Sequence, residues 1–109
     1  MKFDDLLIGF IRLHVLHHAA EHEIYGLWMI DELANHGYRL SPGTLYPMLH
    51  AMERRGYLVS RVKREGRTAR KLYKATKLGR QGLALAKRRV REFTGEAIKQ
   101  ITFQADILP

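Results

Sequence analysis

The sequence predicts a mainly α-helical chain with one small β-hairpin and a long C-terminal helix. Three observations support this fold class. Apolar residues recur at helical spacing through the first 56 positions, in three segments separated by turn residues. The period changes to strand-like alternation over residues 57–76 and becomes helical again from residue 77. With 109 residues, 46% of them hydrophobic, the chain can bury one compact core.

The first predicted helix covers residues 3–20 and has an apolar stripe wider than one packing surface requires. Leu6 and Phe10 lie on one face of this helix, whereas Ile11 and Val15 lie on a neighbouring face. We therefore expect the helix to pack into its own core and also against another subunit.

The second and third predicted helices cover residues 25–36 and 42–55, with Gly37 and Gly56 at their ends. Ser41 is expected to cap the third helix, and Pro42 suits its first turn, where an N–H has no partner. Pro47 removes one hydrogen bond, the one to the carbonyl of Gly43 in the first turn.

A β-hairpin is predicted for residues 57–63 and 70–76, joined by the polar turn 64–69. Only Glu65 is expected to oppose its positive charge. Such an imbalance indicates contact with phosphate groups in preference to a salt-bridged surface. Seven basic residues lie in this hairpin: Arg61, Lys63, Arg64, Arg67, Arg70, Lys71 and Lys74.

The last predicted helix begins at Lys77, after a capping Thr76. Its apolar residues step by threes and fours, a spacing typical of a helix that packs lengthwise against another helix. We expect a homodimer interface in which Leu6 and Phe10 of the first helix also take part. The predicted interface residues on the last helix are Leu83, Ala86, Val90, Phe93, Ala97 and Ile101.

The order of these elements predicts a winged helix-turn-helix in residues 1–76, with the hairpin as the wing. Residues 77–109 form a C-terminal dimerisation helix and tail. In this arrangement the third helix lies in the major groove of DNA and the wing reaches the backbone or the minor groove. The predicted DNA-binding residues are Ser41, Gly43, Thr44, Tyr46, Pro47, His50, Arg54, Arg61, Lys63, Arg64, Arg67, Arg70 and Lys71.

Composition agrees with a nucleic-acid partner. The formal net charge is +8, which favours double-stranded DNA or another polyanion. The chain has no cysteine, and its N-terminal residues lack the pattern of a signal peptide. We therefore expect a cytoplasmic protein that does not enter a membrane, and no catalytic or cofactor-binding motif supports an enzyme.

Three stretches resemble the PadR-like transcriptional regulators: Tyr25-Gly26, SPGTLYPMLHAMERRGYL at 41–58 and RKLYKATKLGRQGL at 70–83. The resemblance implies a dimeric winged-helix repressor that binds a palindromic operator. It also implies release by a small aromatic or drug-like effector. The alternative is a nonspecific architectural nucleic-acid-binding protein, which would use the same charge without reading bases.

Two further groups have weaker signals. Phe10, Trp28, Val90 and Phe93 are candidates for a hydrophobic ligand pocket, although Trp28 at its helical position also suits ordinary packing. His14, His18 and His22 share one helix face, where they form either a polar stripe or a metal site. We favour the polar stripe and expect no metal.

Overall fold

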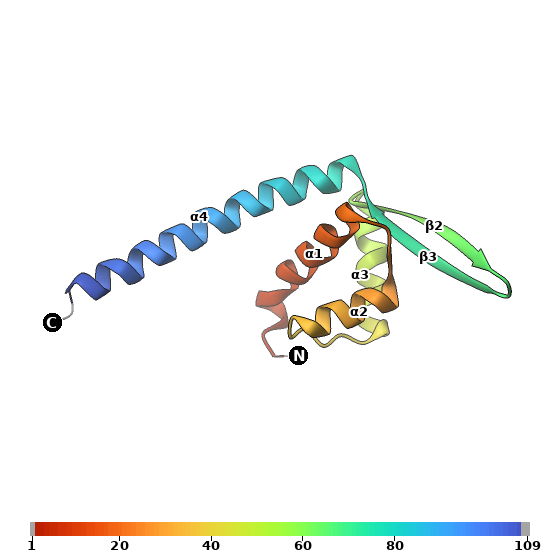
Figure 1. Ribbon diagram of the computed structural model, residues 1–109, viewed down its shortest axis with the longest axis horizontal. Helices are drawn as coiled ribbons and strands as arrows, with labels where there is room; N and C mark the ends of the chain where they lie inside the picture. The colour runs from red at the N-terminus through yellow and green to blue at the C-terminus, as the bar shows by residue number, and fades with distance from the viewer. Residues whose placement is uncertain (1, 108–109) are drawn as a thin grey trace.

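The computed structural model describes the backbone of residues 2–107 and the side chains of residues 2–97. It has four helices and a small antiparallel sheet, which confirms the predicted fold class (Figure 1). The elements in chain order are α1 (Asp4–Glu21), β1 (Ile24–Tyr25), α2 (Gly26–Asn35), α3 (Pro42–Arg54), β2 (Leu58–Glu65), β3 (Thr68–Ala75) and α4 (Lys77–Ile107).

The sheet contains one strand that the sequence did not reveal. β1 pairs antiparallel with β3, with Ile24 opposite Tyr73 and Tyr25 opposite Leu72, so the strand order is β1-β3-β2. The prediction of a two-stranded hairpin was therefore incomplete, and α2 begins at Gly26 instead of residue 25. A two-residue strand has no periodicity to detect. β1 ties the turn before α2 to the base of the wing.

The wing is a long hairpin with a short turn. β2 and β3 pair from Leu58 opposite Ala75 out to Glu65 opposite Thr68. Only Gly66 and Arg67 connect the strands, so the predicted turn at 64–69 was too long. Gly66 has φ of 60°, a left-handed conformation that suits the first central position of a two-residue hairpin turn.

The core lies between the first three helices and the base of the sheet. Ile11 and Val15 of α1 are fully buried, and so are Leu45 and Leu49 of α3. In contrast, Phe3, Leu6 and Phe10 on the other apolar face of α1 are 66%, 69% and 46% exposed. The wide stripe of α1 thus consists of one face in the core and one face on the surface.

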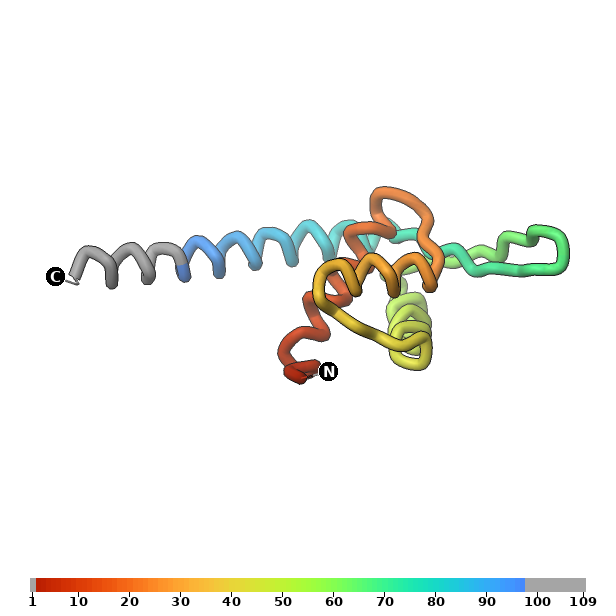
Figure 2. Tube along the Cα trace, turned by 60° about the horizontal axis from the view of Figure 1, so that its bottom comes forward, coloured from red at the N-terminus to blue at the C-terminus, as the bar shows by residue number. Residues whose placement is uncertain are grey.

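α4 leaves this body as an extended arm (Figures 1 and 2). Leu83 packs into the core, but none of the described side chains from 84 to 97 is buried. The radius of gyration is 17.3 Å, compared with about 13 Å for a compact chain of this length. Within the described part of the chain, no helix has both the length and the apolar character that crossing a membrane requires.

Candidate nucleic-acid interface

α3 divides cleanly into a core face and a surface face. Leu45, Met48, Leu49 and Met52 are buried. This division follows from the helical period, because residues three and four apart share a face. The surface face therefore collects most of the predicted α3 site. Its exposed members are Ser41, Gly43, Thr44, Pro47, His50 and Arg54.

The first turn of α3 is open to the surroundings. The Ser41 carbonyl accepts from the N–H groups of Thr44 and Leu45, each at 3.0 Å. Among the described residues, the Ser41 side chain caps no N–H, so the predicted side-chain cap was wrong. Its Oγ instead lies 3.3 Å from Thr44 Oγ1. No hydrogen-bond acceptor for the Gly43 N–H is recorded in the described part of the chain.

Neither the backbone conformation nor the packing of α3 requires a glycine at position 43. It lies within the helix and not in the left-handed conformation of Gly37, Gly56 and Gly66. A Cβ built on Gly43 would meet only Ser41 Oγ at 3.7 Å, which is ordinary van der Waals contact. A glycine normally weakens a helix by up to about 1 kcal/mol relative to alanine. The fold of this chain therefore does not explain its presence.

Tyr46 differs from the other predicted residues of α3 because it is half-buried. Its ring lies on Gly26 at the start of α2, where an added Cβ would come within 2.6 Å of the ring. The ring also lines a cavity of about 350 Å³ with Arg70 and Lys71 of β3. The contact with Gly26 thus places Tyr46 at the junction of α2, α3 and the wing.

Two of the wing cations have carboxylate partners. Arg61 donates to Glu23 through Nε and Nη2 at 2.7 and 2.9 Å, and Lys63 lies 3.2 Å from Glu65. The hydrogen bonds from Arg61 lower the pKa of Glu23 below its usual value. The prediction that only Glu65 opposes the basic wing was therefore wrong, because Glu23 also does so.

The remaining wing cations are exposed. In the described chain, no ion pair is recorded for Arg64, Arg67, Arg70, Lys71 or Lys74. Residues paired across the hairpin share a face. Arg64 opposes Ala69 and Lys71 opposes Val62, so both cations lie on the sheet face that carries Ser60 and Tyr73 toward the core. The Arg70 guanidinium lies 5.4 Å from the centroid of the Tyr25 ring.

A polar joint fixes α3 relative to the wing. Glu53 near the end of α3 accepts hydrogen bonds from the N–H and Oγ of Ser60 in β2, at 3.1 and 2.7 Å. Beneath it, the buried Tyr73 hydroxyl has no hydrogen-bond partner in the described structure. Burial raises the pKa of Tyr73, and the nearby Glu53 adds to this shift. The joint holds the two predicted DNA-binding elements in one arrangement.

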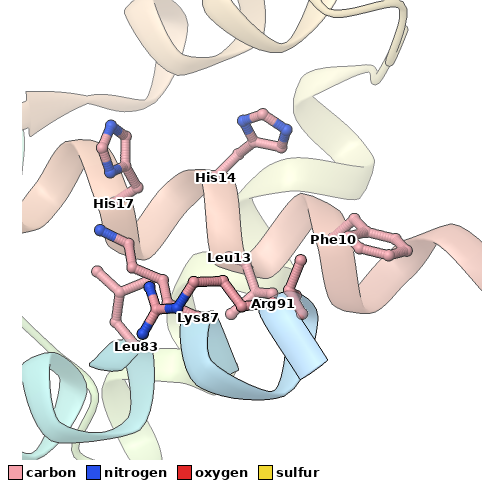
Figure 3. Close-up of a pocket in the computed structure, with 8 residues that line it drawn as sticks. Phe10, Leu13, His14, His17, Leu83, Lys87 and Arg91 are labelled. Carbon is pink, nitrogen blue, oxygen red and sulfur yellow. The ribbon is translucent and has the colours of Figure 1, made fainter. Parts of the chain in front are cut away.

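α1 and α4 enclose an apolar groove on another side of the molecule. One part, of about 520 Å³, is lined by Leu6, Phe10, Leu85 and Val90 among others. An adjoining part of about 330 Å³ also contains His14, His17 and Lys87 (Figure 3). The groove brings together Phe10 and Val90 of the predicted ligand pocket. Trp28 lies elsewhere, on α2 against His18 and His22.

The predicted dimer-interface residues fall into three groups. Leu6, Phe10, Val90 and Phe93 are exposed, and Ala86 and Ala97 are half-buried. Leu83 is 7% exposed because it already packs against α1 in its own chain. Ile101 lies outside the residues whose side chains the structure describes. The exposed members leave an apolar surface that runs from α1 onto α4.

Sequence reasoning gave no role to two residues that shape the site. Glu23 lies 38 positions before Arg61, and nothing in their separation indicates that β1 brings them together. Gly26 belongs to one of the stretches that resembled a known family, but its function appears only in three dimensions. It provides the space in which the Tyr46 ring rests.

Comparison with known proteins now identifies the family. Residues 15–85 match the Transcriptional regulator PadR-like family. This match includes α2, α3 and the whole wing. The chain belongs to the PadR-like family of transcriptional regulators.

Individual PadR-like relatives agree with this assignment. The chain is 48% identical over 88 residues to Transcriptional regulator Rv3488 of Mycobacterium tuberculosis, covering 81% of this chain and 82% of the relative. A PadR family transcriptional regulator from Eggerthella lenta is 28% identical and has a TM-score of 0.77. That match covers 89% of this chain and 86% of the other.

A second solved PadR structure resembles this chain in fold alone. It is Bacillus subtilis PadR in complex with operator DNA, with 19% identity and a TM-score of 0.63. The match covers 69% of this chain and 44% of that protein. The winged-helix architecture of the family is therefore shared across wide sequence divergence.

Proposed function

We propose that this chain is a repressor that binds a palindromic DNA operator as a homodimer. Each subunit places α3 in the major groove and its wing on the adjacent backbone or minor groove. A small aromatic or hydrophobic effector that binds between subunits releases the operator.

The observation that carries the proposal is the open first turn of α3 beside a wing on which five exposed cations have no recorded ion pair in the described chain. Helix N-termini with free N–H groups attract phosphate through both hydrogen bonding and the helix dipole. Gly43 leaves that turn without a side chain, and Ser41 and Thr44 add hydroxyl groups. Pro47 and His50 are exposed on the neighbouring turn, and in this proposal they contact base edges.

The wing adds electrostatic attraction from the same side. Tyr46 of α3 and Lys71 of β3 line one cavity, so the two elements are adjacent where DNA would lie. Each cation that meets a phosphate releases counterions, which makes binding steeply salt-dependent. Arg61 is expected to contribute less than Arg64 or Arg67 because Glu23 already neutralises it.

Dimerisation is supported by the apolar surface of α1 and α4. Phe93 is 68% exposed and Leu6 is 69% exposed. A large exposed apolar surface on a small protein marks an interaction site. A second copy of the same surface would cover it, and two-fold symmetry would match a palindromic operator.

In this proposal the effector binds in the apolar groove between α1 and α4, on the same surface that pairs the subunits. The groove volumes of about 520 and 330 Å³ lie within the range of small-molecule sites. Phe10 and Val90 line both parts. A planar apolar molecule held there would change the spacing between subunits and so misalign the two α3 helices on the operator.

Selection of duplexes from a random DNA pool, followed by footprinting, tests the proposal. We expect enrichment of an inverted repeat and a steep fall in affinity with salt. The double change Arg64→Gln with Arg67→Gln should reduce the log–log salt slope by about 3 to 4, because a dimer loses four cations. Arg88→Gln, an exposed arginine of α4, serves as the charge control and should change the slope little.

A different outcome would support the architectural alternative. If affinity for the selected duplex equals that for random duplex, the chain binds without reading bases. If no duplex is bound at low salt, the DNA-binding proposal itself is wrong. A screen for small molecules that release the selected duplex then tests the effector separately.

A further inference from the structure

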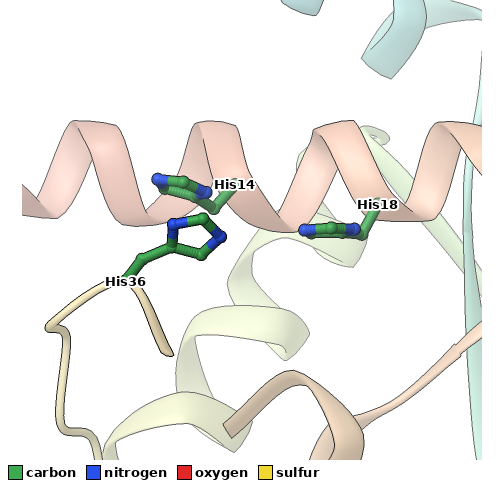
Figure 4. A group of neighbouring side chains, drawn as sticks. All are labelled: His14, His18 and His36. Carbon is green, nitrogen blue, oxygen red and sulfur yellow. The ribbon is translucent and has the colours of Figure 1, made fainter. Parts of the chain in front are cut away.

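A cluster of histidines lies between α1 and the end of α2. His14 and His18 lie one turn apart on α1, and His36 follows α2 (Figure 4). One ring nitrogen from each lies within 4.8 Å of the other two. The His14 and His36 rings are 4.7 Å apart between centroids. Three imidazoles from two elements thus converge on one point.

Glu32 supplies a carboxylate beside two of these three imidazoles. Its Oε1 lies 3.4 Å from His18 Nε2 and 3.3 Å from His36 Nε2. A tetrahedral Zn²⁺ site with bonds of about 2.0–2.1 Å separates its ligand atoms by roughly 3.4 Å. The carboxylate oxygen therefore already has the spacing to two imidazole nitrogens that a shared ion requires.

We propose that His14, His18, His36 and Glu32 bind a divalent transition-metal ion such as Zn²⁺. Three imidazole nitrogens and one carboxylate oxygen suit Zn²⁺, Co²⁺ and Ni²⁺ better than Mg²⁺ or Ca²⁺, which prefer oxygen ligands. The ion would connect the middle of α1 to the C-terminal end of α2.

The surroundings of the cluster are compatible with a bound ion. Burial lowers the pKa of His14, and the nearby His36 adds to this effect. Burial also lowers the pKa of His18, although Glu32 opposes that shift. A lowered pKa favours the neutral imidazole, which is the form that binds a metal ion. The His18 and Glu32 side chains are 15% and 25% exposed, whereas that of His36 is 46% exposed, so an ion could enter the cluster from the His36 side.

A second group of donors provides the competing location. His17, His18 and Glu21 also lie within 4.8 Å of one another, and all three belong to α1. Glu21 is 59% exposed and His17 is 42% exposed. The first group has three imidazoles, has Glu32 beside two of them, and connects two elements, so we assign the ion there. The two groups share only His18, which makes them separable by mutation.

Isothermal titration of the untagged protein with Zn²⁺ tests the assignment. We expect one ion per chain. His36→Gln and Glu32→Gln should each weaken Zn²⁺ binding by about a hundredfold or more, since even changes around a ligand cost 10–100-fold. His17→Gln is the matched control, with the same chemical change on α1, and should retain wild-type affinity.

Trp28 offers an independent readout of the location. It is the sole tryptophan of the chain, and its ring centroid lies 5.2 Å from that of His18. Co²⁺ bound to the cluster should quench Trp28 fluorescence and give the intense visible absorption of a tetrahedral site, and Zn²⁺ should reverse both. Zn²⁺ in about 100-fold excess over its Kd should also raise the Tm by about 5 °C or more.

These metal-binding measurements do not depend on whether the chain binds DNA. Failure of the wild-type chain to bind Zn²⁺ or Co²⁺ would overturn the proposal. So would wild-type affinity in both His36→Gln and Glu32→Gln, with circular dichroism showing that they are folded. Loss of binding in His17→Gln and Glu21→Gln instead would place the ion on α1 alone and reject the assigned site.

Discussion

The starts of α3 and α4 contain the same parts, a hydroxyl side chain followed within three residues by a glycine, but use them differently. At α4, Thr76 Oγ1 accepts from the Gly79 N–H at 3.0 Å and donates to the Gly56 carbonyl. A Cβ on Gly79 would collide with the carbonyl oxygen of Tyr57. At α3, Ser41 caps no N–H among the described residues, and a Cβ on Gly43 would fit.

The start of α4 is therefore closed by packing and capping, whereas the start of α3 is open, and we propose that it binds DNA. Thr76 and Gly79 hold the start of α4 against the chain segment before β2. The Thr76 hydroxyl and the Gly79 N–H both form hydrogen bonds within the molecule. Gly43 weakens α3, and Ser41 does not cap it; no contact within the described chain compensates for either. Gly43 is the helical glycine of this kind that lies in the first turn of α3, where we propose that DNA approaches closely. Substitutions of the glycine and the hydroxyl residue at each helix start test this difference.

Gly79→Ala should have the largest effect. Its methyl group meets backbone atoms, which cannot move as a side chain can, so we expect a loss of about 3 kcal/mol in the free energy of unfolding. Urea denaturation followed by circular dichroism measures it. Gly82→Ala is the matched control in the same helix, where nothing lies within 4 Å of the added Cβ. The control should be neutral or stabilising by up to about 1 kcal/mol.

Thr76→Val should have the next largest effect. The change keeps the shape of the side chain but leaves the Gly79 N–H and the Gly56 carbonyl without their partner. Loss of a helix cap typically costs about 1–2 kcal/mol. The same urea experiment measures it, and an unchanged midpoint would mean that these hydrogen bonds contribute nothing to stability.

Gly43→Ala should separate stability from binding. We expect the free energy of unfolding to stay the same or to rise by up to about 1 kcal/mol, because alanine favours helix. Affinity for the selected DNA duplex should fall about tenfold, or roughly 1.4 kcal/mol, since the methyl group occupies the phosphate position. Fluorescence anisotropy measures the affinity. Undiminished affinity would show that DNA does not approach this turn.

Ser41→Ala should have the smallest effect on the fold. Because its side chain caps no N–H in the described structure, the free energy of unfolding should change by less than about 0.5 kcal/mol. DNA affinity should fall by a few-fold through loss of one hydroxyl group. A loss of stability as large as that of Thr76→Val would mean that Ser41 does cap α3 in solution.

Helical periodicity in the sequence was enough to locate all four helices, and the basic hairpin was found from alternation and charge. The start of α4 at Lys77 was also predicted, because Thr76 and the following heptad-like spacing are local signals. α3 was placed correctly from Ser41-Pro42 and Gly56. These features depend on neighbours within a few residues, so the sequence reports them directly.

The features that were missed depend on contacts between distant residues. β1 exists because β3 offers an edge to Ile24 and Tyr25, which have no strand signal of their own. The ion pair of Arg61 with Glu23 and the resting place of Tyr46 on Gly26 follow from that pairing. The third histidine of the cluster, His36, comes from the end of α2, whereas the sequence pointed to His22 on α1.

The most direct test of the open helix start is an NMR titration of backbone amides with the selected duplex. The N–H signals of Gly43 and Thr44 in α3 and of Arg64 in the wing should shift most. The Gly79 N–H, already bonded to Thr76, should stay in place. Large shifts at Gly79 and along α4, with Gly43 and Arg64 unmoved, would contradict the proposal that α3 and the wing bind DNA together.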